Sequence, residues 1–273
     1  MITNSKQNVR LTSTHAWAMP GIYISLLLVF IASVAATIYF CLSMSDGMHM
    51  SGGWTMSMIW MRMPGQTWLS SAIMFLAMWT AMMVAMMLPS AMPMILSYYR
   101  MRRSQCSCGC LRSTLTMAAA YFLIWIVMGA VVYLVGVPFA AAAMHSMKLS
   151  HAIPAIIAAA VLLAGCLQFM PWTMRSLCRC RESTFLGMSS PHHHWGLPLR
   201  TGISRGIACV VCCSGPMAVL LMLGMMNPFV IIITTVVIAM EKLMPRPEIV
   251  VRLMGAAALI LGLMMFYKLI QSA

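Results

Sequence analysis

The sequence predicts an all-α fold, a polytopic membrane helix bundle of about seven transmembrane helices that forms a single integral membrane domain over residues 1–273. Three observations support this prediction. Hydrophobic residues make up 62% of the chain and charged residues 8%, whereas soluble proteins contain about 45–50% apolar and about 25% charged residues. Several apolar stretches reach the roughly 20 residues that cross a bilayer. The basic residues are concentrated in alternate connecting segments.

Hydropathy along the chain indicates seven spans. The first is longer than the apolar segment of a signal peptide, which has about 7–15 residues, so we expect an uncleaved helix. Pro89 and Pro93 lie in the second span and are expected to kink or unwind it. The sixth span is short and ends in Glu241 and Lys242, whose charged groups we expect to reach the inner membrane surface. The predicted spans are residues 20–42, 69–97, 114–140, 152–170, 205–224, 227–243 and 250–270.

The distribution of Lys and Arg predicts the orientation of the bundle. With the N-terminus inside and seven alternating spans, all of the 17 basic residues except Arg62, Lys148 and Lys268 fall in inner segments. This asymmetry is typical of cytoplasmic loops and predicts that the C-terminus lies outside. The formal charge of +13 therefore indicates the membrane topology, with the lipid bilayer as partner and no nucleic acid.

Two predicted outer loops are rich in soft ligand atoms. Thioether and imidazole groups with little carboxylate suit Cu(I) better than magnesium, calcium or manganese. The alternative is an interfacial segment in which Met packs beside Trp54, Trp60 and Trp68. The candidate metal ligands in the outer loops are Met48, His49, Met50, Met56, Met58, Met144 and His145.

The second span carries a row of methionines. Met78, Met82 and Met86 are four residues apart and therefore share one face of a helix. They are candidate ligands for a soft metal ion moving inward from the outer loops. The alternative is adaptable packing, for which Met is well suited.

The ten cysteines supply candidate ligands toward the inner side. The predicted inner loops contain the sequences CSCGC and CRC among arginines, and the reducing cytoplasm favours metal-binding or redox thiols over structural disulfides there. Three further cysteines lie inside the fifth span near Pro216, as either packing residues or a metal site within the membrane. The candidate cysteine ligands are Cys106, Cys108, Cys110, Cys178, Cys180, Cys209, Cys212 and Cys213.

Three segments in this order carry a resemblance to a known family: FLAMWTAMMVAMMLPSAMPM, LQFMPWTMRSLCRCR and CVVCCSGPMAVLLMLGMMNPF with AMEKLMP after it. Over residues 65–265 the chain resembles an uncharacterised bacterial family of predicted metal-binding integral membrane proteins. The resemblance implies a metal-related membrane role and a bacterial origin. Together with the predicted topology, it implies a multi-pass protein of the bacterial inner membrane. One departure is that Ser176 stands where the family has the first of two closely spaced cysteines, with Cys178 and Cys180 nearby.

These patterns favour a protein that handles Cu(I), captures it at the outer Met/His loops and delivers it inward to cysteine. Two alternatives remain open: a copper- or thiol-dependent membrane oxidoreductase subunit, and a non-catalytic assembly or interaction subunit. Phosphate-binding, HExxH and GxSxG motifs are absent, which favours a protein that is not an enzyme. Copper is the expected metal, and a periplasmic or membrane metalloprotein is a candidate partner.

Overall fold

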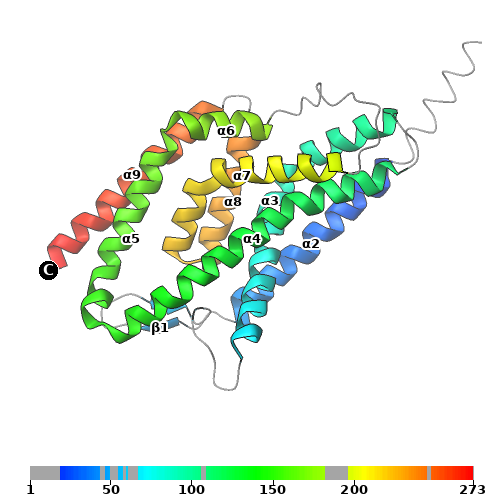
Figure 1. Cartoon of the computed structure of the whole chain (residues 1–273). Helices are drawn as coiled ribbons and strands as arrows, with labels where there is room; N and C mark the ends of the chain where they lie inside the picture. The colour runs from blue at the N-terminus through cyan, green and yellow to red at the C-terminus, as the bar shows by residue number, and fades with distance from the viewer. Residues whose placement is uncertain are drawn as a thin grey trace, which may run out of the picture.

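A computed structural model describes residues 19–43, 47–49, 55–57, 60, 67–105, 109–181, 196–244 and 247–272. Within these residues the chain forms eight helices and one two-stranded antiparallel sheet, as Figure 1 shows, so the predicted all-α class is confirmed. The strands are β1 (Gly47–His49) and β2 (Thr55–Ser57). The helices are α2 (Met19–Ser43), α3 (Trp68–Gln105), α4 (Cys110–His145), α5 (Met147–Gln168), α6 (Pro171–Arg181), α7 (Gly196–Leu223), α8 (Pro228–Leu243) and α9 (Pro247–Ser272).

Six of the described helices are long and apolar enough to cross a membrane: α2, α3, α4, α5, α7 and α9. They coincide with six of the seven predicted spans, which indicates a multi-pass membrane protein. The predicted span 227–243 corresponds to α8, whose 16 residues are fewer than the roughly 20 that cross a bilayer. The amphipathic α6 and the β-hairpin were not predicted. The orientation of the bundle remains a prediction.

Helix α3 forms much of the core. The side chains of Met78, Met82 and Met86 are at most 3% exposed, because they lie on the face that packs against α2, α4 and α8. The sequence predicts that Pro89 and Pro93 kink or unwind this helix. The helix continues through both residues, so the prediction of unwinding is wrong and a kink stays a prediction. Prolines are tolerated in such helices where neighbouring helices and polar side chains surround the backbone.

Helices α4 and α7 approach closely because two glycines in α7 face α4. A Cβ atom at Gly202 would overlap the backbone carbonyl oxygen of Met117, and one at Gly206 would lie 2.9 Å from the side chain of Ile124. Small residues four apart are a common means of bringing membrane helices together. This packing fixes the position of the cysteines that follow in α7 relative to Tyr121 of α4.

Helix α7 changes direction along its length in Figure 1, and Pro216 is its interior proline. Gly224 then adopts a positive φ of 108°, which glycine accommodates without a side-chain clash. The Asn227 side chain accepts a hydrogen bond from the backbone N–H of Phe229 and caps α8. The turn directs α8 back along α7, so residues near the end of α8 lie beside the middle of α7.

Candidate metal centre

Among the described residues, one group of three ligand-type side chains lies close enough to hold a metal ion. The sulfur atoms of Cys180, Cys209 and Cys212 all lie within 4.8 Å of one another. Cys213 adjoins them, with its sulfur 3.5 Å from that of Cys212 and 4.0 Å from that of Cys209. We refer to these four residues as the cysteine cluster. Its members come from two helices, α6 and α7.

The cysteine cluster lies inside the protein. Cys209, Cys212 and Cys213 are 0%, 3% and 1% exposed, and Cys180 is half-buried. Spacing within α7 explains part of this arrangement, because residues 209 and 213 share one face of the helix. The approach of Cys180 depends on the packing of α6 against α7.

The sulfur of Cys209 accepts two hydrogen bonds from other helices. The hydroxyl group of Tyr121 in α4 donates at 2.9 Å, and the ammonium group of Lys242 in α8 also donates at 2.9 Å. A cation beside a sulfur ligand offsets the negative charge that a thiolate brings into a region of low dielectric constant. The cysteine cluster is therefore arranged to accept negative charge.

The pKa of the Cys180 thiol differs from that of an isolated cysteine. Its hydrogen bond with Cys209 raises the pKa of the Cys180 thiol to about 11, so this thiol is protonated at neutral pH. A metal ion that binds Cys180 has to displace that proton, because the thiolate is the ligand.

Lys242 and Glu241 are buried, with 8% and 2% of their surfaces exposed. The carboxylate of Glu241 accepts a hydrogen bond from the side-chain amide of Gln168 at 2.8 Å. The prediction that both groups reach the membrane surface is therefore wrong. Both side chains find polar partners inside the bundle, which is what makes burial of charged groups tolerable.

The methionine row of α3 reaches the cysteine cluster at Lys242. The ammonium group of Lys242 lies 3.9 Å from the sulfur of Met87 and 3.4 Å from the hydroxyl oxygen of Ser90. Met87 is fully buried and follows Met86 directly. Thioether and thiol sulfurs therefore surround the same cation.

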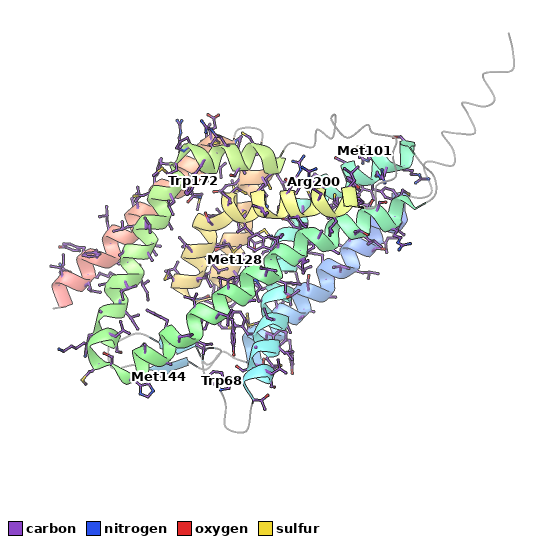
Figure 2. All side chains as sticks on the ribbon, in the orientation of Figure 1. Trp68, Met101, Met128, Met144, Trp172 and Arg200 are labelled. Atoms are coloured by element: carbon purple, nitrogen blue, oxygen red, sulfur yellow. The ribbon has the colours of Figure 1, made fainter. Side chains whose placement is uncertain are left out.

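The other predicted ligands are not members of the cysteine cluster. Met78, Met82 and Met86 lie buried in α3, whereas Met144 and His145 are exposed at the end of α4. Figure 2 shows Met144 at the same end of the bundle as Trp68, opposite Trp172 of α6. Cys178 is exposed and Cys110 is half-buried.

Several predicted ligands cannot be placed. Met50, Met58, Cys106 and Cys108 lie outside the described residues. For Met48, His49 and Met56 the backbone is described, and Met48 is paired with Met56 across the hairpin. The side chains of these three residues lie outside the description, so the outer-loop site stays a prediction.

Four residues that contact the cysteine cluster or its cation were not predicted from the sequence as part of a site: Tyr121, Lys242, Met87 and Ser90. A signal was present for Lys242, because a lysine next to a glutamate at the end of an apolar segment is expensive to bury and such residues tend to be functional. Tyr121 had no such signal, since its role depends on the approach of α4 to α7.

The chemistry of the cysteine cluster favours a soft, monovalent ion. Thiolate ligands select Cu(I), zinc and iron–sulfur clusters over hard cations. A tetrahedral zinc site requires four ligands, and Cys213 is available as a fourth. The adjacent ammonium group repels a divalent ion twice as strongly as a monovalent one at the same distance, which favours Cu(I).

Part of the chain matches a known protein family. Residues 76–265 match a protein family described as PpoB2, a copper chaperone. The match covers nearly the same region as the resemblance given above, residues 65–265. That resemblance implied only a metal-related role, whereas the matched family is described as copper-related. No curated protein and no solved structure matches the chain.

Proposed function

The chain belongs to the PpoB2 family of copper chaperones, and we propose that it is a multi-pass membrane protein that carries one Cu(I) ion on the sulfurs of Cys180, Cys209 and Cys212. The observation that carries this proposal is the convergence of these three sulfurs within 4.8 Å. Three thiol sulfurs from two helices form a soft ligand set with room for a small ion at its centre.

Lys242 acts in this proposal as the charge partner of the loaded site. Three thiolates and one Cu(I) ion carry a net negative charge, which is costly inside a bundle without compensation. The ammonium group 2.9 Å from Cys209 supplies that compensation. Tyr121 adds a hydrogen bond to the same sulfur and holds its orientation.

Copper reaches the cysteine cluster along α3. The row Met78, Met82 and Met86 is buried, and Met87 at its inner end contacts Lys242 beside Cys209. Thioethers bind Cu(I) as neutral ligands, so a row of them allows stepwise transfer toward the thiols. The predicted outer Met/His loops would supply the ion at the other end.

We propose that the bundle lies in a bacterial cytoplasmic membrane with its arginine-rich end facing the cytoplasm. Figure 2 has Met101, Trp172 and Arg200 at one end of the bundle and Trp68 and Met144 at the other. The basic residues at the end of α3 and the start of α7 support a cytoplasmic location for the first of these ends. Copper then moves from the outer end toward the cytoplasmic side.

The test is the copper content of purified protein. After anaerobic loading with Cu(I) and a wash with a competing chelator, we expect one copper per wild-type chain and none in a variant with Cys180→Ser, Cys209→Ser and Cys212→Ser. The matched control, Cys41→Ser with Cys166→Ser, changes cysteines outside the cysteine cluster and should keep its copper. Equal copper in the triple variant and wild type would overturn the proposal. A parallel loading with Zn²⁺ distinguishes a zinc site.

A further inference from the structure

A cavity of about 590 Å³ opens where α5, α6 and α9 meet. Its volume falls in the range of roughly 300–1,000 Å³ that small-molecule sites occupy. Of the two long apolar helices at this cavity, α5 ends at Gln168 and α9 begins at Pro247. The cavity therefore lies where their membrane-spanning lengths end, which is the level of the lipid headgroups. The lining residues that matter here are Phe169, Met170, Pro171, Arg175, Glu248 and Arg252.

The polar part of the cavity wall carries an excess of positive charge. Arg175 comes from α6 and Arg252 from α9, and Glu248, four residues before Arg252, adds a carboxylate. Both arginine side chains are exposed, and within the described residues neither guanidinium group has a hydrogen bond or an ion pair with another residue. Both groups are therefore available to a ligand, and the guanidinium group matches the oxygen atoms of a phosphate.

The rim of the cavity is apolar. Phe169 and Met170 line the cavity and are each 49% exposed. Trp172, Ile249 and Leu253 directly follow lining residues in the sequence and are also exposed. Tryptophan is enriched at the membrane–water interface, and exposed aliphatic side chains of a membrane helix face the acyl chains. A cationic pocket with an apolar rim suits a ligand that has an anionic head and hydrocarbon chains.

We propose that this cavity binds the phosphate headgroup of an anionic phospholipid, whose acyl chains lie along the apolar side chains of the rim. This inference goes beyond the proposed function and does not depend on copper. Basic pockets between membrane helices on the cytoplasmic side bind headgroups of this kind. Trp172 of α6 lies at the same end of the bundle as Arg200 in Figure 2, the end that the proposed orientation places at the cytoplasmic surface.

The charge of the cavity matches that of a phosphodiester. Two guanidinium groups and one carboxylate leave an excess of one positive charge, which one phosphodiester group neutralises. A phosphate monoester carries about 1.5–2 negative charges at neutral pH and would leave part of that charge uncompensated beside an apolar rim. A headgroup that contacts both arginines also connects α6 with α9, because each of these helices contributes one of them.

The experiment measures binding to the full chain in neutral detergent by titration calorimetry, with protein-free micelles as the blank. The probes are short-chain phosphatidylglycerol, short-chain phosphatidylcholine, which has no net charge, and glycerophosphoglycerol, which is the first headgroup without acyl chains. We expect phosphatidylglycerol to bind more tightly than either of the others. Equal affinities for the two lipids would overturn the anion site. Equal affinities for phosphatidylglycerol and glycerophosphoglycerol would identify a site for a soluble anion and overturn the assignment to lipid.

The two arginines are tested one at a time. Arg175→Gln and Arg252→Gln should each weaken the binding of phosphatidylglycerol about fivefold, which is the contribution of one basic residue near an anionic membrane surface. Binding of phosphatidylcholine should not change. Arg200→Gln, which removes an exposed arginine at the same end of the bundle, is the matched control and should bind like wild type. Equal weakening in this control would indicate diffuse attraction to a basic surface and overturn the site.

Glu248→Gln tests the same wall with the opposite sign. This variant should bind phosphatidylglycerol more tightly, by about fivefold, because the repulsion between the carboxylate and the phosphate is removed. A damaged fold lowers affinity, so a gain in this variant does not arise from misfolding. Unchanged or weaker binding would overturn the assignment of the cavity to the headgroup. These titrations use protein without copper, so their failure and the failure of the proposed function are separate results.

Discussion

The cysteine cluster and the turn between α4 and α5 carry the same kind of soft ligand in different surroundings. The cluster brings together thiols from α6 and α7, and its central sulfur, on Cys209, is fully buried. At the turn, Met144 and Met147 are 43% and 72% exposed, and His145 is exposed as well. These residues belong to one continuous segment. Met144 lies at the opposite end of the bundle from Trp172 of α6 (Figure 2).

This difference shows that the type of ligand and the arrangement of the ligands determine different properties of a metal site. Thioether, imidazole and thiol groups indicate which metal a chain prefers. A site also requires ligands that are held in place by packing and by hydrogen bonds from neighbouring residues. The cysteine cluster meets this requirement through Tyr121 and Lys242, and the predictions below test the comparison.

The largest effect is expected where the packing that assembles the cysteine cluster is broken. Leucine at Gly202 and Gly206 would push α7 away from α4, because the backbone of Met117 and the side chain of Ile124 occupy the required space. Overpacking costs about 1–3 kcal/mol per position. If about 3 kcal/mol of this overpacking energy makes the free energy of Cu(I) binding less favourable, the affinity for Cu(I) falls on the order of 100-fold.

The measurement is chelator competition for Cu(I), together with thermal unfolding in detergent. Gly196→Leu is the matched control, since open space surrounds that glycine at the start of the same helix. Copper affinity that is equal in the double variant and this control would show that the cysteine cluster does not depend on the contact between α4 and α7.

A smaller effect is expected from removal of the cation. Lys242→Met keeps an unbranched apolar stem but leaves the loaded cysteine cluster without its charge partner. Loss of a residue that supports a metal ligand typically costs about 10–100-fold in affinity. The same substitution should raise the affinity for Zn²⁺ relative to that for Cu(I), because the repulsion of a divalent ion is removed.

The control for this variant is Lys148→Met, which changes an exposed lysine beside the soft residues of the α4–α5 turn. It should leave both affinities unchanged. If Lys242→Met binds Cu(I) as tightly as wild type, charge compensation by this ammonium group plays no part in copper binding.

Much of the helical architecture could be predicted because apolar length is a local property of the sequence. Six predicted spans correspond to long helices, with ends that differ by up to nine residues. Helix α6 was missed because its 11 residues include Arg175, Arg179 and Arg181, which gives no long apolar run. Its amphipathic character is nevertheless what allows Leu177 to be buried while Trp172 stays exposed.

The cysteine cluster could be predicted only in part. Residue type identified Cys180, Cys209 and Cys212 as candidates, and helical spacing related Cys209 to Cys213. The approach of Cys180 results from tertiary packing of α6 on α7. Sequence periodicity does not predict which helices pack together, so it could not predict this approach. Lys242 was assigned to the membrane surface because its position near a helix end fits that role, whereas its burial follows from partners on α3 and α7.

The smallest effect is expected at the α4–α5 turn. Met144→Leu with His145→Gln removes a thioether and an imidazole while keeping side-chain size similar, and volume-conserving exchanges usually cost less than about 1.5 kcal/mol even in a core. Both residues are exposed, so the free energy of unfolding should hardly change. Copper that survives a chelator wash should also be unchanged, because the cysteine cluster retains all of its ligands. The informative measurement is the rate of loading from dilute Cu(I), which should fall if this turn captures the ion and stay constant if the turn is only an interfacial segment. A loss of chelator-resistant copper would contradict the comparison, since it would show that exposed ligands on one continuous segment bind the ion as tightly as the buried thiols do.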